Sequence, residues 1–391
     1  MTIILTFDNC NAIPPSCIAK IIQGDKLPRN GGIWRIENEI RPSDLYCYLY
    51  AKFGEPNGIQ NLLRQNDSDN LIHWEWVLAH SNGLIFIMGL NLRTEVHLIG
   101  DWEFGKYSKD QFINYIKTDI NKYGKKMSDF RKNVLEHWDI FTNPYHDINT
   151  AIKQLVRDLN ELKLNPEEES LANPSDFSEY DNFVEKWNAL ISRYHRGIGL
   201  ALGIKSLTPV LAESFVNLLI YLLCKPDIKN NERLYQNFVR GNIDIKVQSL
   251  HNNCFSFKGP VDWSSEVCTK YNSIVNERND LLHGNINIEK LKFQDIFFRE
   301  KVPLFKEYST IWQQSIGVSI NSSGLQKIQD GIATIRSFEN YVLSLLEDGV
   351  EDQVRTIMEK RDLGINRSNG RIGVLLPDIL VDFVVSFISK K

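Results

Sequence analysis

The sequence lacks the charge excess that marks many nucleic-acid-binding proteins. Its 391 residues include 45 Lys and Arg against 49 Asp and Glu, which gives a net charge of only −4. A protein that binds long nucleic acid regardless of sequence usually carries a basic excess. Any contact with RNA is therefore expected to be a local patch rather than a whole-surface field.

Cysteines and long apolar runs are also scarce. The six Cys, at positions 10, 17, 47, 224, 254 and 268, form no CxxC pair and no cluster with His at zinc spacing. They are expected to be reduced thiols. The N-terminus lacks the basic region and apolar core of a signal peptide, and no uninterrupted apolar run approaches about 18 residues. These absences predict a cytoplasmic protein with no membrane partner.

The motifs of several enzyme classes are missing. The sequence has no phosphate-binding G-x-x-x-x-G-K-[ST] loop, no G-x-G-x-x-G after a strand, no H-E-x-x-H and no G-x-S-x-G. No two of the histidines in the first 150 residues combine helical i,i+4 spacing with a supporting carboxylate, so they are interpreted as ordinary surface or core residues. We expect no metal and no cofactor.

Hydrophobic periodicity predicts two domains of different class. Strand-like runs cover 31–40, 73–80, 84–90 and 94–99, and Ser81-Asn82-Gly83 is a strong hairpin signal. Helical spacing begins after residue 107 and continues through the chain. The predicted fold class is α+β: an N-terminal α+β domain with a small antiparallel sheet, followed by an all-α helical bundle. The expected divisions are 1–165 for the α+β domain, 166–176 for a linker, 177–349 for the helical domain and 350–391 for a C-terminal tail.

The helical domain is expected to contain helices at 177–192, 209–224, 232–250, 264–282, 293–316 and 328–346. A basic cluster at 193–197 follows the first, as a solvated helix end or a phosphate contact. The helix from Pro209 is the most apolar, and Glu213 and Asn217 interrupt it on one face. They either mark its exposed stripe or point into a cleft.

One short segment, 277–284, concentrates polar chemistry. It places Arg278, Asn279, Asp280 and His283 together at the expected end of a helix, before a glycine that can stop it. At about 100° per residue, Arg278 and His283 lie about 140° apart around the helix, whereas Asn279 and His283 share a face. The Arg and His of one chain therefore flank a site, and a second copy would complete a cleft.

This Arg-Asn-(three residues)-His-Gly pattern resembles the Arg-(four to six residues)-His signature of HEPN domains, an all-helical family, over residues 208–349. The resemblance implies a HEPN-like bundle and a metal-independent endoribonuclease, in which the 2′-hydroxyl of RNA attacks the adjacent phosphorus and leaves 2′,3′-cyclic phosphate and 5′-hydroxyl ends. It also implies a composite site built by two HEPN units. Because one such motif occurs here, a homodimer through the helical domain, or a partner with the second motif, is expected.

The residue types suit that reaction. An imidazole such as His283 can exchange a proton near neutral pH, and the fixed charge of Arg278 can stabilise the extra negative charge of the transition state. Asn279 is expected to orient the phosphate or the histidine. Supporting or substrate-binding roles are expected for Glu213, Asn217 and Asp280.

A single HEPN unit behind an unrelated α+β domain also resembles effectors of prokaryotic anti-phage defence and toxin systems. That resemblance implies that residues 1–165 bind a protein partner or a phage-derived trigger. One alternative stays open. Arg278 could pair with Glu277 or Glu213 while His283 serves as a helix cap, and the domain would then be a non-catalytic module for nucleic-acid or nucleotide binding or for complex assembly.

Overall fold

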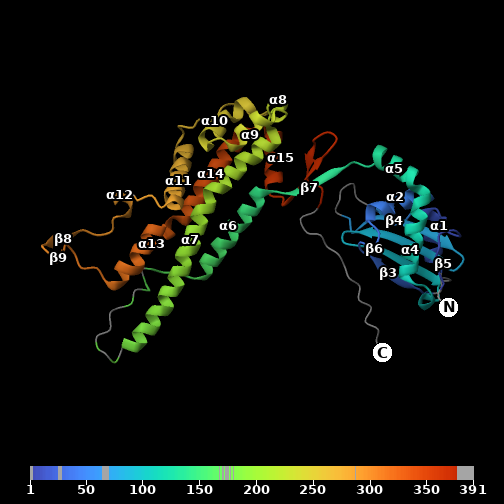
Figure 1. Ribbon diagram of the computed structural model, residues 1–391, viewed down its shortest axis with the longest axis horizontal. Helices are drawn as coiled ribbons and strands as arrows, with labels where there is room; N and C mark the ends of the chain where they lie inside the picture. The colour runs from blue at the N-terminus through green and yellow to red at the C-terminus, as the bar shows by residue number, and fades with distance from the viewer. Residues whose placement is uncertain are drawn as a thin grey trace. The chain divides into compact units, whose positions relative to one another are not determined.

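The computed structural model describes residues 3–24, 29–63, 70–166, 168, 169, 171, 176, 178, 180–286 and 288–376. The chain divides into two compact units. Unit 1 comprises Met1–Ile140 with Gly364–Lys391, and unit 2 comprises Phe141–Leu363 (Figure 1). Helices and a small, largely antiparallel sheet are both present, so the protein is of the mixed α+β class.

Unit 1 is built around one six-stranded sheet. Its order is β1-β4-β5-β6-β2, and β3 also pairs with β6. All pairings are antiparallel except that of β2 with β6. The strands are β1 (Asn11–Ala12), β2 (Arg29–Asn30), β3 (Gly32–Ile36), β4 (Ile72–His80), β5 (Gly83–Leu90) and β6 (Thr94–Asp101).

The predicted Asn-Gly hairpin joins β4 to β5 and is confirmed. Gly83 has a φ of 137°, and a Cβ there would lie 2.2 Å from the backbone oxygen of Ile99, so only glycine fits. Successive residues of β4 face opposite sides of the sheet: Trp76 belongs to one core and Val77 to another. Both faces of this hairpin are therefore covered.

Helices of unit 1 supply that cover. Residues of α2, α4 and α5 complete the core around Trp76, and Ile18 of α1 completes the core around Val77. The helices and helical turns are α1 (Pro15–Gln23), α2 (Pro42–Phe53), α3 (Gln60–Leu63), η1 (Phe104–Lys106), α4 (Lys109–Asp119), η2 (Ile120–Tyr123) and α5 (Gly124–Asn133).

A separate three-stranded sheet has the order β11-β10-β7, with β7 at Trp138–Thr142, β10 at Asp362–Asn366 and β11 at Ile372–Gly373.

Unit 2 is mainly helical, and its large core surrounds α7 (Tyr180–Leu223). Other residues of this core come from α6, α9, α10, α11, α14 and α15. The other helices and turns of the unit are α6 (Pro144–Glu161), α8 (Pro226–Lys229), α9 (Glu232–Arg240), α10 (Ile243–Asn253), α11 (Glu266–His283), α12 (Ile288–Leu291), η4 (Gln313–Gly317), α13 (Val318–Ser323), η5 (Leu325–Lys327), α14 (Ile328–Ser344) and α15 (Asp348–Met358).

The helix α7 corrects one expectation. Two helices, at 177–192 and 209–224, were expected with a basic cluster at 193–197 between them. The structure instead has a single helix of 44 residues from Tyr180 to Leu223, which carries Pro209 in its interior. Buried Tyr194 packs edge-on against Trp312 in a second, smaller core, so the cluster lies within the helix rather than at its end. Tertiary packing on both sides of Pro209 outweighs the backbone bond that proline removes.

The region 293–316 corrects a second expectation. A helix was predicted there, but the structure has an antiparallel hairpin of β8 (Ile296–Arg299) and β9 (Val302–Phe305). All eight strand residues are exposed. The spacing of apolar residues suggested a helix because the two-residue turn at Glu300 and Lys301 lacks the Asn or Gly that marks hairpins.

The boundaries of the units differ from the expected 165 and 349. Tyr145 and Ile152 of α6 are buried in the core of unit 2, so this helix belongs to the helical unit. In the expected linker, Glu169 accepts a hydrogen bond of 2.6 Å from the Tyr194 hydroxyl. The expected tail at 350–391 contains α15, β10 and β11, and positions 377–391 lie outside the described residues.

In the described part of the chain, α7 is the one helix long and apolar enough to cross a membrane by length and composition. Half of its most apolar 18-residue window is buried inside the protein. Ala212, Phe215 and Leu219 are fully covered by neighbouring helices. This burial matches the core helix of a soluble protein.

Candidate active site

The predicted motif lies at the end of α11, as the sequence indicated. The side chain of Ser265 caps the start of the helix by accepting a hydrogen bond from the Cys268 amide. Tyr271 is buried and stacks on Phe338 of α14 at 4.1 Å between ring centroids. The helix stops at Gly284, whose φ of 61° and ψ of 34° form a left-handed cap. Packing at one end and this cap at the other fix the residues between them.

Arg278 is half-buried and has no carboxylate partner in the described part of the chain. Its Nη1 donates to the Oδ1 of Asn279 at 3.0 Å, and its Nε is buried without a hydrogen-bond partner. The two carboxylates expected as alternative partners pair with lysines: Glu277, which lines the same cavity as Arg278, faces the Lys205 ammonium at 4.0 Å, and Glu213 faces Lys246. The guanidinium is therefore held by an amide and forms no ion pair with a described carboxylate.

His283 is exposed and is the last residue of α11. The structure gives its ring no hydrogen bond to any described residue, so both ring nitrogens are open to a ligand or to water. The capping bonds at this helix end come from the backbone: the Gly284 and Asn285 amides donate to the last carbonyls. The helix end is thus completed without the imidazole.

Asp280 holds the turn that follows the motif. The Asn285 amide donates to its carbonyl at 2.9 Å, and the Asn285 side chain donates to its Oδ1 at 3.1 Å. These two contacts tie the chain just beyond His283 back to the helix. Asp280 therefore shapes the backbone beside the motif, where the sequence suggested a substrate-binding or supporting role.

Glu213 and Asn217 lie next to each other and contact Lys246, and neither lines the cavity that contains Arg278. Both accept hydrogen bonds from the ammonium of Lys246, at 2.8 Å and 3.1 Å, and a third bond goes to the Val239 carbonyl. Lys246 is 1% exposed, so these three acceptors satisfy a buried cation. Glu213 and Asn217 also line a cavity of about 540 Å³ with residues of α6 and α9. Of the two alternatives left open by the sequence, the one in which they point into the motif's cleft is not supported, because Arg278 lines a different cavity.

The cavity at Arg278 is formed by α7, α11, η5 and α14 and holds about 60 Å³. Two cations that sequence reasoning missed, Lys205 and Lys327, line it with Arg278 and Glu277, whereas His283 does not. No sequence signal links these three cations, because they lie on separate elements. Pockets for small ligands usually hold about 300–1,000 Å³, so this one is too small to enclose a nucleotide.

Unit 1 carries a wider groove of about 1130 Å³ on its sheet. A charged cluster lines it: Glu95 receives bonds from Arg93 at 2.6 Å and His97 at 2.7 Å, with Arg35 at 3.9 Å. Burial raises the pKa of Glu95, but the hydrogen bonds from His97 and Arg93 outweigh it and hold the pKa below its usual value. The ionised cluster gives the groove a polar edge beside apolar walls.

Among the described residues, no group of three or more His, Cys, Asp or Glu side chains is placed to hold a metal ion. Comparison of the chain with protein-family models, with curated proteins and with solved structures finds no match. The chemistry of the site therefore has to be argued from its own residues.

Proposed function

We propose that the protein is a metal-independent endoribonuclease of the HEPN type. The observation that carries the proposal is the pairing, at one helix end, of an arginine without a carboxylate partner and an exposed histidine without a hydrogen bond, among the residues described. A half-buried guanidinium held only by a neutral amide is suited to bind a phosphate. An open imidazole is suited to move a proton.

In the proposed reaction, His283 takes the proton of an RNA 2′-hydroxyl or gives one to the leaving 5′-oxygen. The 2′-oxygen bonds to phosphorus as the bond to the 5′-oxygen breaks, which leaves a 2′,3′-cyclic phosphate and a 5′-hydroxyl. Arg278 stabilises the added negative charge on the phosphoryl oxygens. Asn279 keeps the guanidinium in place through the bond at 3.0 Å.

Two copies of the motif are needed in this mechanism. One helix turns Arg278 and His283 to different sides, and the cavity at Arg278 holds only about 60 Å³. A second chain would supply the opposite wall and a second base or acid. Lys205 and Lys327 would extend the cationic surface for the neighbouring phosphates.

The cellular role proposed is that of a cytoplasmic effector in prokaryotic anti-phage defence or a toxin system. Unit 1 would bind the protein partner or phage-derived trigger, with the groove lined by Glu95 and Arg93 as the contact surface. This assignment rests on the resemblance of the domain arrangement rather than on chemistry at the groove.

The test is cleavage of mixed RNA in the presence of EDTA, with analysis of the product ends. Arg278→Ala and His283→Ala should each lower the rate by roughly 10²–10⁴, and the double variant should be little worse than either because both residues act on one transition state. Lys270→Ala, on the exposed side of α11, and His195→Ala, exposed on α7, are matched controls that should cleave normally.

Products with 5′-phosphate ends, loss of activity on chelation, or full activity in His283→Ala would reject the mechanism. RNA binding without cleavage, weakened by Arg278→Ala, would instead favour the non-catalytic binding module. In a host cell, expression of the wild-type chain should be toxic, and Arg278→Ala should relieve that toxicity.

A further inference from the structure

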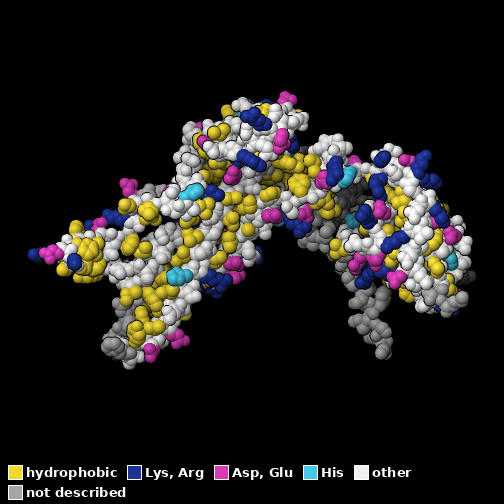
Figure 2. Space-filling model, viewed as in Figure 1, with side chains coloured by type: hydrophobic (Ala, Val, Ile, Leu, Met, Phe, Trp, Pro, Cys, Tyr) yellow, Lys and Arg dark blue, Asp and Glu magenta, His cyan; other side chains and the backbone are white. Residues whose placement is uncertain are grey.

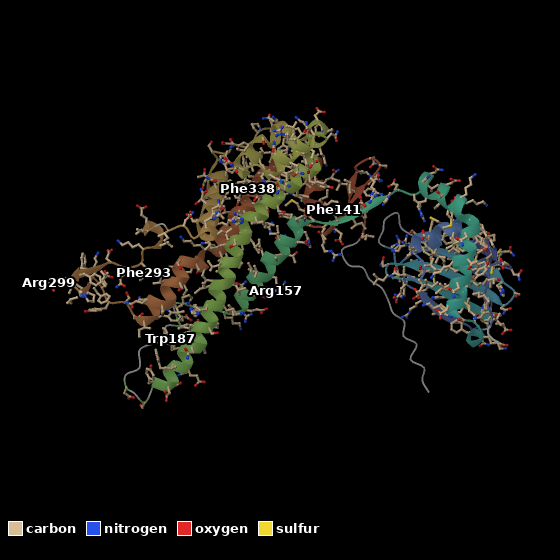
Figure 3. The ribbon with its side chains drawn as sticks, in the orientation of Figure 1. Phe141, Arg157, Trp187, Phe293, Arg299 and Phe338 are labelled. Atoms are coloured by element: carbon tan, nitrogen blue, oxygen red, sulfur yellow. The ribbon has the colours of Figure 1, made fainter. Side chains whose placement is uncertain are left out.

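The segment that follows the motif helix is mostly exposed and carries many apolar side chains. We define the arm as the described residues of 286–311, which include α12, β8 and β9. Its most exposed large side chains are Ile286 at 85%, Ile288 at 73% and Tyr308 at 93%. Figure 3 shows Phe293 and Arg299 on the arm away from the helices of unit 2, and Figure 2 shows apolar side chains gathered at its tip.

An uncovered two-stranded hairpin is at best marginally stable in water. No residue of β8 or β9 is buried, and the ring contact within the arm joins Phe305 to Tyr308, both of which are themselves exposed. A contiguous apolar surface of this kind marks an interaction site in a soluble protein. No described residue of the chain covers the hairpin of the arm, so the hairpin is expected to need a partner molecule.

The area available is sufficient for a stable interface. Five aromatic residues of the arm are exposed: Phe293 at 67%, Phe297 at 61%, Phe298 at 62%, Phe305 at 43% and Tyr308 at 93%. At about 150–250 Å² for each fully exposed aromatic side chain, they present on the order of 650 Å². With the aliphatic residues between them, a partner that contacts both faces of the hairpin could reach the roughly 800 Å² that a standard protein interface buries on each side.

The charge of the arm argues against a nucleic acid or an anionic membrane as that partner. Residues 286–311 contain five Lys and Arg and four Asp and Glu, so the segment is nearly neutral. Some of these charges pair within the arm, as Lys292 does with Asp295 at 2.7 Å. Binding to phosphates or anionic lipids requires a clear basic excess. A balanced apolar surface instead fits another protein surface of the same character.

The arm is also continuous with the candidate site. Leu282, in the last turn of α11, is 53% exposed, and the exposed side chains of Ile286 and Ile288 follow it in the chain. A partner that covers the beginning of the arm would therefore lie close to His283, which is three residues before Ile286. In a two-fold dimer, each copy offers the same surface to the other, so an arm on each chain would bring both motifs to one interface.

We infer that the arm is the contact surface for a second copy of this chain, through which the dimer required by the proposed function would form. The need for a second motif rests on the proposed function, whereas the exposure, area and charge balance of the arm are independent of that function.

The experiment measures the mass of the full chain in solution by light scattering at micromolar concentration. The wild type should have twice the 45.2 kDa chain mass. The double variant Phe297→Ser and Phe298→Ser should be monomeric with an unchanged helical circular dichroism spectrum, because both side chains are exposed in the single chain. Leu234→Ser with Ile245→Ser removes two aliphatic side chains, 50% and 59% exposed on α9 and α10, and should remain dimeric.

The outcomes separate the arm from the reaction. A monomeric wild type, or a dimer that the Phe297 and Phe298 changes leave intact, overturns the arm as the dimer contact. A monomeric chain whose arm binds RNA or anionic vesicles, with binding lost in the double variant, also overturns it by assigning the surface to those partners. A wild-type dimer that depends on the arm but cleaves no RNA supports the arm and rejects the ribonuclease.

Discussion

The two hairpins of this protein have the same secondary structure and opposite surroundings. In unit 1, β4 and β5 lie in the middle of a sheet, and Trp76, Val77 and Leu78 are fully buried on its two faces. In unit 2, β8 and β9 pair with one another alone, and each of their residues is exposed. The first hairpin is stabilised by contacts within the chain, whereas the second leaves its apolar side chains exposed, so that a partner can cover them.

The same contrast holds for the charged groups of the two units. Asp119, 2% exposed, accepts bonds from the Tyr48 hydroxyl at 2.7 Å and from the ammonium of Lys52 at 2.5 Å. Its charge is compensated within unit 1. Arg278 of unit 2 has an amide as its hydrogen-bond partner in the described part of the chain. Function is expected where groups are left incomplete, because a completed cluster has no capacity for a ligand.

The largest effect is expected at the covered hairpin. Trp76→Ala removes a fully buried side chain whose Nε1 donates to the Gly54 carbonyl at 3.2 Å, and it should lower the free energy of unfolding by about 3–5 kcal/mol. Phe297→Ala, in β8, is the matched change at the exposed hairpin and should alter the unfolding of the single chain by less than about 0.5 kcal/mol. Urea unfolding followed by circular dichroism at low protein concentration compares them. Equal effects would show that the arm is covered within its own chain.

The next effect concerns the compensated charge. Burial raises the pKa of Asp119, but the hydrogen bonds from Lys122, Lys52 and Tyr48 prevail and hold it well below its usual value. A depressed folded pKa contributes stability that is present above the unfolded value of about 3.9 and is lost as the pH falls through the folded value. Asp119→Asn should therefore destabilise the protein at pH 7 by about 3 kcal/mol, since it leaves Lys52 without its anion.

Unfolding measured across pH 2–7 checks the sign. The difference between wild type and Asp119→Asn should shrink as the pH falls below about 4. Asp44→Asn removes the carboxylate of a more exposed pair with Arg131, and it should cost less than about 1 kcal/mol. A difference between wild type and Asp119→Asn that stays constant with pH would contradict the account of Asp119.

The smallest expected effect is the difference in stability loss between alanine substitutions at two glycines with positive φ. Gly83→Ala would place a Cβ 2.2 Å from the Ile99 oxygen in the covered hairpin, and it should cost about 3 kcal/mol. Gly284→Ala, after the motif, meets nothing within 4 Å and should cost about 1 kcal/mol from its backbone conformation alone. Thermal unfolding of both variants measures the difference. A loss of stability at Gly284 larger than that at Gly83 would mean that other groups pack against the chain beyond His283, where the structure leaves space.

The sequence predicted the features that depend on nearby residues. Asn82 and Gly83 identified the β4–β5 hairpin, and Gly284 identified the end of α11, because both signals act through local backbone conformation. The β8–β9 hairpin was missed for the converse reason. Its turn places Glu300 at a φ of 58°, a conformation that glutamate rarely adopts and that no sequence rule anticipates.

The candidate site was predicted in part. Arg278, Asn279 and His283 are close in sequence, so their placement on one helix end could be anticipated. Glu213 and Asn217 were correctly placed on one face of a helix, but which neighbours that face meets depends on tertiary packing, and Lys246 of α10 meets it. Lys205 and Lys327 reach the Arg278 cavity from α7 and η5, a juxtaposition that arises only on folding.

Pro209 gives the long helix α7 a mechanical weak point beside the candidate site. Over 44 residues the helix extends roughly 66 Å at 1.5 Å per residue. Proline has no amide hydrogen for the carbonyl four residues earlier, and that carbonyl belongs to Lys205, whose side chain lines the cavity with Arg278. Helices bend where their hydrogen-bond ladder is interrupted. If α7 bends, the bend is expected at the turn that carries Lys205, and a force on either end of the helix would then move this lysine relative to Arg278.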